Sequence, residues 1–167
     1  MVPDGTFPYT TGSAGNSTVL HNLPSFCRVV GTIRPTSDSA IGFELWLPDP
    51  WNGRYLQSGN GGFAGHINYD GLAPGLRDGF AVASTDDGHT GDDASFALGH
   101  PEKLIDYGYR AVHLSSEKAK TIVSTYYGQG QLRSYFSGCS DEWPRSTHGG
   151  TAIPGRLRRL ARRRARQ

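Results

Sequence analysis

The spacing of apolar residues is the feature that most constrains the fold of this sequence. Short runs rich in β-branched and aromatic residues, bounded by Gly, Pro and polar turns, predict strands at residues 26–33, 41–47, 54–58, 79–85 and 133–137. Residues 104–127 instead carry apolar side chains at three- and four-residue spacings, which predicts one amphipathic helix ending at Gly128. Strand, helix and strand in this order indicate an α/β fold, and the first two strands are expected to form an antiparallel hairpin.

The composition agrees with one folded domain. The chain has 167 residues, of which 36% are hydrophobic and 19% charged, with 23 Gly and 10 Pro. It is too apolar for a disordered chain and too rich in Gly and Pro for a coiled coil. No run reaches the roughly 18 apolar residues of a membrane span, and no signal peptide opens the sequence. We therefore expect no membrane partner, and the sequence leaves localisation and oligomeric state open.

Charge divides the chain into two parts. Residues 1–142 contain all 15 acidic residues and 9 of the 17 basic ones, whereas residues 143–167 contain eight arginines and no acid. An arginine cluster can neutralise phosphates. One functional hypothesis is therefore a non-catalytic protein that binds nucleic acid or an acidic partner through residues 155–166. No base-reading side chains are interleaved, so such binding would lack sequence specificity.

The run Gly138-Cys139-Ser140 after the last predicted strand is half of a nucleophile elbow, G-x-S-x-G. In that motif a tight turn exposes the serine hydroxyl and points the next backbone N–H, here that of Asp141, at the developing oxyanion. Glu142 stands where the motif has its second glycine, and serines also close many ordinary strand ends. Ser140 is therefore a candidate nucleophile, with a structural turn as the alternative.

An earlier glycine-rich segment, residues 59–62, follows the strand predicted at 54–58. This is where α/β hydrolases place the loop that supplies the other oxyanion N–H groups, so Gly61 and Gly62 are candidates for that role. The alternative is a flexible surface loop. The two motifs together favour a hydrolase more than either one alone.

No metal site is predicted. The six histidines, His21, His66, His89, His100, His113 and His148, show no metal-ligand spacing, and two cysteines make neither a zinc site nor a disulfide scaffold. His89 follows two aspartates, as in an acid–base pair. A polar loop whose side chains bind their own backbone is the favoured interpretation.

Several long segments resemble the tannase and feruloyl esterase family of serine esterases. They are FCRVVGTIRPTSDSAIGFELWLPDPWNGRYLQSGNGGFAG, FAVASTDDGH, DASFALGHPEKLIDYGYRAVHLSSEKAK and RSYFSGCS, and the likeness covers residues 18–140. The resemblance implies an α/β-hydrolase core over residues 1–141, truncated after the nucleophile strand. It implies hydrolysis of a small aromatic ester, such as a ferulate or gallate, and relatives that are usually secreted or periplasmic.

The resemblance also assigns residues. The family motif G-C-S-x-G-G places the nucleophile at Ser140, and it pairs Cys139 in a disulfide with a cysteine beside the catalytic histidine. That cysteine, the catalytic Asp and His, and a calcium-bearing lid domain follow the nucleophile by hundreds of residues in the family. After Ser140 this sequence has only Asp141, Glu142 and His148 as acid or base. The 167-residue chain is therefore expected to be inactive by itself and to hold no cofactor.

Residues 142–167 depart from the family pattern. With suitable codons for Glu142 onward, translation one base later gives NGREALMEAQRYPEDFD, which is like the helix that follows the nucleophile in the family. We therefore interpret residues 142–167 as an out-of-frame translation of a GC-rich gene. The predicted consequence is an arginine-rich tail that is disordered and unpacked from the core.

Overall fold

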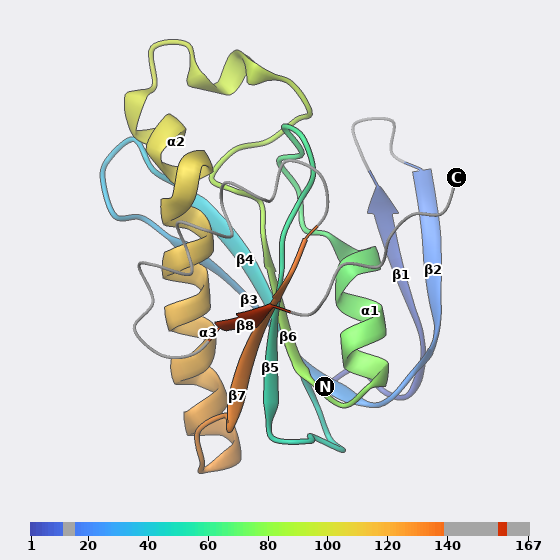
Figure 1. Ribbon diagram of the computed structural model, residues 1–167. Helices are drawn as coiled ribbons and strands as arrows, with labels where there is room; N and C mark the ends of the chain where they lie inside the picture. The colour runs from blue at the N-terminus through green and yellow to red at the C-terminus, as the bar shows by residue number, and fades with distance from the viewer. Residues whose placement is uncertain (12–15, 139–156, 160–167) are drawn as a thin grey trace.

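The computed structural model describes residues 1–11, 16–138 and 157–159. A six-stranded sheet in the order β3-β4-β6-β5-β7-β8 forms its centre, and a separate hairpin lies to one side (Figure 1). The sheet strands are β3 (Phe26–Ile33), β4 (Ile41–Pro48), β5 (Arg54–Ser58), β6 (Ala81–Thr85), β7 (Arg133–Ser137) and β8 (Leu157–Arg159). The hairpin strands are β1 (Gly5–Thr11) and β2 (Asn16–Leu23).

The sheet is mixed. β3 pairs antiparallel with β4 and β4 antiparallel with β6, so the predicted hairpin is confirmed. β5 pairs parallel with both β6 and β7. Because β5, β6 and β7 run in the same direction, the loops that follow them meet at one edge of the sheet.

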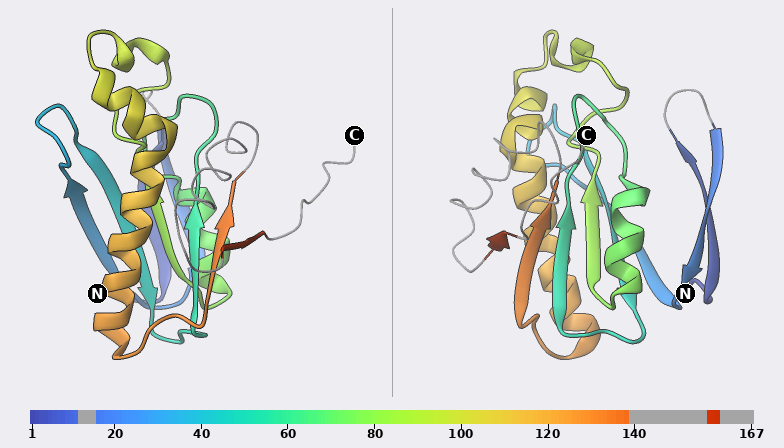
Figure 2. Two further views of the ribbon diagram at one scale, coloured as in Figure 1. Left: turned by 60° about the vertical axis from the view of Figure 1, so that its left-hand side comes forward. Right: turned by 45° about the vertical axis from the view of Figure 1, so that its right-hand side comes forward.

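Helices α1 (Tyr69–Arg77) and α3 (Ala111–Tyr127) cover opposite faces of the sheet (Figure 2). Alternate residues of β4 supply the two cores, because successive strand side chains point to opposite faces. Trp46 packs with Leu72 and Leu76 of α1, whereas Leu45 packs with Val123 of α3. The strand is therefore buried on both faces, which explains its nearly continuous apolar sequence.

The predicted helix 104–127 is confirmed as part of a longer helical segment. It begins with α2 (Pro101–Ile105), passes through one π-helical turn, η2 (Asp106–Arg110), and continues as α3 to Gly128. The sequence analysis assumed a single period of 3.6 residues. The wider π turn shifts that period, so Tyr109 is 43% exposed while Asp106 is fully buried.

Helix α1 was not predicted, because its sequence, YDGLAPGLR, contains two glycines and a proline. Asn68 caps the helix by accepting a hydrogen bond from the Gly71 N–H at 2.9 Å. Gly75 lies directly against the sheet, where a Cβ would stand 2.6 Å from Leu56 and 2.7 Å from Val82. Close packing on the sheet thus uses a residue that local propensity disfavours in a helix.

The hairpin β1–β2, which was also not predicted, packs on an aromatic cluster. Phe7 contacts Trp46 edge to face with ring centroids 4.9 Å apart, and Tyr9 lies 4.9 Å from Tyr69. The Tyr9 hydroxyl donates to Asp70 at 2.7 Å. Aromatic packing thus attaches the hairpin to the α1 side of the sheet.

Part of the predicted tail differs from expectation. Residues 157–159 form β8, which pairs parallel with β7, whereas an unpacked tail was predicted. Without β8, β7 would present unpaired backbone groups along its outer edge, and the pairing satisfies some of them. Residues 142–156 and 160–167 lie outside the described residues. In the part of the chain that the structure describes, no helix is long and apolar enough to cross a membrane.

Removal of residues 142–167 should leave the body folded. Three residues of edge pairing contribute little against about 1–2 kcal/mol per residue of backbone ordering. We expect the midpoint of thermal unfolding to change by less than about 4 °C when the chain ends at Asp141. Circular dichroism melting of both chains measures this, and loss of the cooperative transition in the shortened chain would refute the prediction.

Candidate functional site

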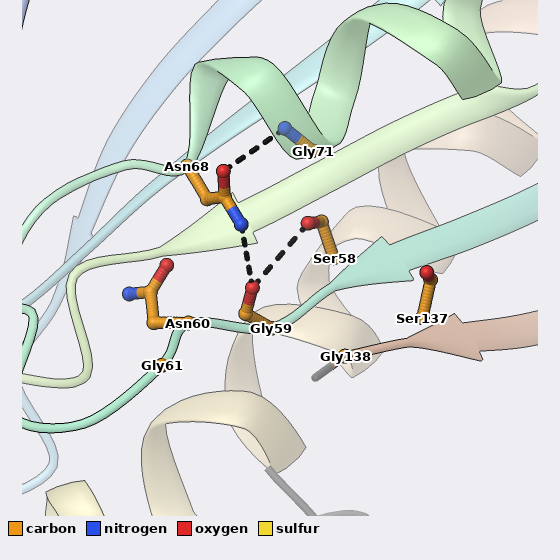
Figure 3. Close-up of a pocket in the computed structure, with 8 residues that line it drawn as sticks. All are labelled: Ser58, Gly59, Asn60, Gly61, Asn68, Gly71, Ser137 and Gly138. Atoms are coloured by element: carbon orange, nitrogen blue, oxygen red, sulfur yellow. Dashed lines mark hydrogen bonds between the residues drawn. The ribbon is translucent and has the colours of Figure 1, made fainter. Parts of the chain in front are cut away.

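A pocket of about 320 Å³ lies where β5 and β7 end (Figure 3). Its lining comes from the loop after β5, the start of α1 and the end of β7, namely Ser58, Gly59, Asn60, Gly61, Asn68, Gly71, Ser137 and Gly138. In Figure 3 the Ser58 and Ser137 side chains stand on neighbouring strands. The pocket therefore sits at the carboxyl edge of the parallel strands, where α/β folds bind ligands.

Hydrogen bonds tie the pocket walls together. The Gly59 N–H donates to the Ser137 carbonyl at 2.9 Å, which joins the glycine loop to the end of β7. The Asn68 amide donates to the Gly59 carbonyl at 2.8 Å, which joins the same loop to the start of α1 (Figure 3). The backbone N–H and carbonyl of one glycine, Gly59, thus bind both neighbouring elements.

The structure describes only some of the predicted site residues. Ser140, Cys139 and Asp141 lie outside the described residues, so their roles stay predictions. Gly138, two residues before Ser140, lines the pocket together with Gly61. The two motifs that the sequence analysis paired therefore converge, as far as the chain is described.

Gly61 and Gly62 contribute differently. Gly61 lines the pocket, and its amide donates no hydrogen bond within the described part of the chain. Gly62 has a φ of +55°, a left-handed conformation that favours glycine, and its carbonyl accepts from the Tyr107 hydroxyl at 2.9 Å. Of the two, only Gly61 is part of the pocket lining.

A group of buried polar residues lies behind this loop, and Asn60 is the member that no sequence pattern indicated. Asn60, Asp87 and His89 are each less than 5% exposed. The favoured interpretation of a polar loop that binds its own backbone holds for Asp86, which accepts from the Gly88 N–H at 2.9 Å. The His89 ring instead binds the Phe63 carbonyl through Nε2 at 2.9 Å. A single Asn between glycines gave no signal, because its partners are distant in sequence.

Among the described carboxyl groups near the site, that of Asp86 has the most strongly shifted pKa. The pKa of Asp86 is raised to about 6, mainly because the carboxyl is buried. Hydrogen bonds from the N–H groups of Gly88 and Gly42 act in the opposite direction and lower the pKa. Both amides donate to the same oxygen, Oδ1, at 2.9 Å. Asp106 lies nearby and raises the pKa further through its charge.

The described residues offer no cluster of metal ligands. Nowhere among them do three or more His, Cys, Asp or Glu side chains gather as a metal ion requires. The calcium that the resemblance assigns to a lid domain therefore has no fitting residues here. Cys27 is a half-buried free thiol.

A mixed sheet with helices on both faces, and a glycine loop beside the end of a later strand, defines part of an α/β hydrolase. The solved structure of feruloyl esterase B from Aspergillus oryzae superposes with a TM-score of 0.73 at 34% identity, over 83% of this chain and 27% of that one. The predicted fold class is confirmed. Residues 27–143 match the family model described as tannase and feruloyl esterase, and the chain belongs to this family.

Curated relatives agree with this assignment. An uncharacterized esterase of Xanthomonas campestris pv. campestris is 49% identical over 143 residues, which are 84% of this chain and 24% of the relative. A probable feruloyl esterase B-2 of Aspergillus flavus is 38% identical over 83% of this chain and 27% of its own length. The chain thus spans about a quarter of the length of the relatives it matches.

The raised pKa of Asp86 predicts a pH dependence of stability. Because the folded-state pKa exceeds the ordinary aspartate value of 3.8, the unfolded state releases this proton at lower pH. The free energy of unfolding should therefore fall as pH rises from about 4 to about 6. Asp86→Asn keeps an Oδ1 acceptor for both amides, and it should remove this loss, which is of the order of 1–3 kcal/mol.

Urea unfolding of both chains at pH 4 to 7 measures the difference. Asp78→Asn, at an exposed position after α1, is the matched control and should follow the wild-type profile. If Asp86→Asn also follows that profile, burial does not perturb the Asp86 carboxyl as described.

Proposed function

We propose that this chain is the nucleophile-bearing part of a carboxylic ester hydrolase that cleaves small esters of aromatic acids. Hydroxycinnamic and gallic esters are the proposed substrate class, in keeping with the names of the family and of the Aspergillus relatives. Ser140 is the proposed nucleophile. The amides of Asp141 and Gly61, with Gly62 in the same loop, form the proposed oxyanion hole.

One observation carries the proposal: the glycine loop and the approach to Ser140 share one pocket. The 2.9 Å hydrogen bond from the Gly59 N–H to the Ser137 carbonyl holds the two segments side by side. Gly61 and Gly138 line the pocket that results. Ser140 follows Ser137 by three positions, and a chain of that length spans at most about 11 Å.

The proposed reaction is acyl transfer through the serine. The Ser140 hydroxyl oxygen attacks the ester carbonyl carbon while a base takes its proton. The carbonyl oxygen becomes an oxyanion, to which the backbone amides donate hydrogen bonds. The bond to the alcohol then breaks, the base returns its proton to the alcohol, and water hydrolyses the acyl-serine to release the acid.

The base and its orienting acid lie outside the described residues in this proposal. The resemblance assigns both to regions that follow the nucleophile by hundreds of residues in the family. His148, eight residues after Ser140, is a poor substitute, because α/β hydrolases bring the base from a later loop. No step of the proposed reaction uses a cofactor.

A chimeric esterase tests this proposal directly. Residues 1–141 would replace the matching region of the Xanthomonas campestris esterase, whose remaining chain then supplies base and acid. We expect the chimera to hydrolyse methyl ferulate or methyl gallate. Ser140→Ala should lower its kcat by at least about 1,000-fold, because covalent catalysis is lost.

Ser124→Ala is the matched control, since Ser124 is half-buried on α3 and is not among the pocket-lining residues, so this change should leave kcat unchanged. The parent esterase is assayed on the same two esters. A folded chimera that hydrolyses neither ester, beside an active parent, would contradict the proposal.

The 167-residue chain by itself should show little or no hydrolysis of the same esters. Loss of the base of a serine hydrolase typically costs several orders of magnitude in rate. Product formation from methyl ferulate, followed by liquid chromatography, measures this. Turnover by the purified chain that disappears in Ser140→Ala would refute the prediction.

A further inference from the structure

Side chains hold the glycine loop in place, and two of them, His89 and Tyr107, lie outside the pocket lining. Its residues, 59–66, contain four glycines and would be mobile without tertiary contacts. Instead, several of its backbone oxygens accept hydrogen bonds from buried or half-buried side chains. Asn68 binds the Gly59 oxygen, and three further residues bind the rest of the loop: Asn60 within it, His89 after β6, and Tyr107 in the π turn η2.

Asn60 connects the loop to the end of β6. Its side chain is 3% exposed. The amide nitrogen lies 2.9 Å from the carbonyl oxygens of His66 and Thr85, and 3.1 Å from that of Ala64. One buried amide therefore binds both the far end of its own loop and the neighbouring strand end.

Tyr107 and His89 hold the middle of the loop. The Tyr107 hydroxyl donates to the Gly62 carbonyl at 2.9 Å, and His89 Nε2 donates to the Phe63 carbonyl at 2.9 Å. The His89 ring stacks on Phe96 with centroids 3.8 Å apart, which limits its rotation. The π turn places Tyr107 toward the loop, while Tyr109 on the same turn is exposed.

These bonds determine which way the loop amides point. A trans peptide is planar, with N–H and C=O on opposite sides, so fixing an oxygen fixes the following N–H. The Gly59 oxygen is held by Asn68, the Gly61 oxygen by the Ala64 N–H, and the Gly62 oxygen by Tyr107. Among the described residues, no donor binds the oxygen of the peptide joining Asn60 to Gly61, so the held peptides on either side of it restrict how the Gly61 N–H can point. The first residue of that peptide, Asn60, is itself held through the hydrogen bonds of its side chain.

We propose that Asn60, His89 and Tyr107 are positioning residues that hold the Gly61 amide toward the pocket. This inference rests on the proposed function, in which that amide stabilises the oxyanion. A donor that is already oriented needs no reorganisation when charge develops, which is the main benefit of an oxyanion hole. His89 and Tyr107 thus act on the reaction through the backbone, and Asn60 does so while also lining the pocket.

Tyr107→Phe is the decisive variant, because it removes one hydroxyl and keeps the ring. Tyr109→Phe, two residues away and exposed, is its matched control. In the 167-residue chain, NMR hydrogen exchange is measured at the Ala64 and Gly65 amides, which are hydrogen-bonded within or beside the loop. We expect exchange about 5- to 10-fold faster in Tyr107→Phe only, with unchanged exchange in β4 and β6.

His89 offers a test by conservative rescue. His89→Leu removes the donor to the Phe63 carbonyl and should speed exchange at the same amides. His89→Gln carries an amide nitrogen near the position of Nε2, so it should keep exchange within about 2-fold of wild type. Equal exchange in the Leu and Gln variants would overturn the role of His89.

The chimeric esterase separates positioning from simple stability. Tyr107→Phe should lower its kcat about 10-fold with KM unchanged, because only the transition state carries the oxyanion. An unchanged kcat in a chimera with faster loop exchange would overturn the inference and leave the proposed function intact. Equal exchange in Tyr107→Phe and Tyr109→Phe would overturn it as well.

A chimera without any Ser140-dependent hydrolysis would instead overturn the proposed function and the catalytic part of this inference. The exchange measurements on the 167-residue chain would then still decide whether these side chains hold the loop.

Discussion

The parallel pairing of β5 with β7 places Ser58 directly opposite Ser137, and the candidate site depends on this register. The two strands are separated by more than 70 residues of chain, yet both end at the same edge of the sheet. The next peptide, Gly59, continues the ladder by donating to the Ser137 carbonyl. A shift of one residue would turn every side chain of β7 to the other face and separate the glycine loop from the approach to Ser140.

Behind that edge, the structure buries polar groups that an ordinary core would exclude. Asn60, Asp87 and His89 are nearly inaccessible to water, and Asp87 adopts a left-handed backbone conformation with a φ of +57°. Such groups are costly to bury unless they are hydrogen-bonded. Here Asn60 and His89 donate hydrogen bonds to the glycine loop. These bonds offset the cost of burying the polar side chains, and they also restrict the glycine-rich backbone. Burial also makes the charged form of Asp86 less favourable, which raises the pKa of this carboxyl to about 6.

Local sequence patterns predicted the central strands because their apolar runs are short and bounded by clear turns. Strands β3, β5 and β7 begin and end at the predicted residues. The patterns failed at α1, where Gly71, Pro74 and Gly75 disfavour a helix that sheet packing nevertheless stabilises. The patterns also missed the π turn at Asp106–Arg110. The spacing of apolar residues indicates a helix but does not show that one of its turns contains an extra residue.

For the site, the sequence by itself determined the two motifs: a glycine-rich loop after β5 and the run Gly138-Cys139-Ser140 after β7. These follow from residue types and their neighbours along the chain. Only the tertiary structure decided that Gly61 rather than Gly62 lines the pocket with Gly138, and that His89 and Tyr107 bind the loop from behind. The physical reason is that these hydrogen bonds join residues about 25 to 45 positions apart, and no local preference encodes which carbonyl such a donor will reach.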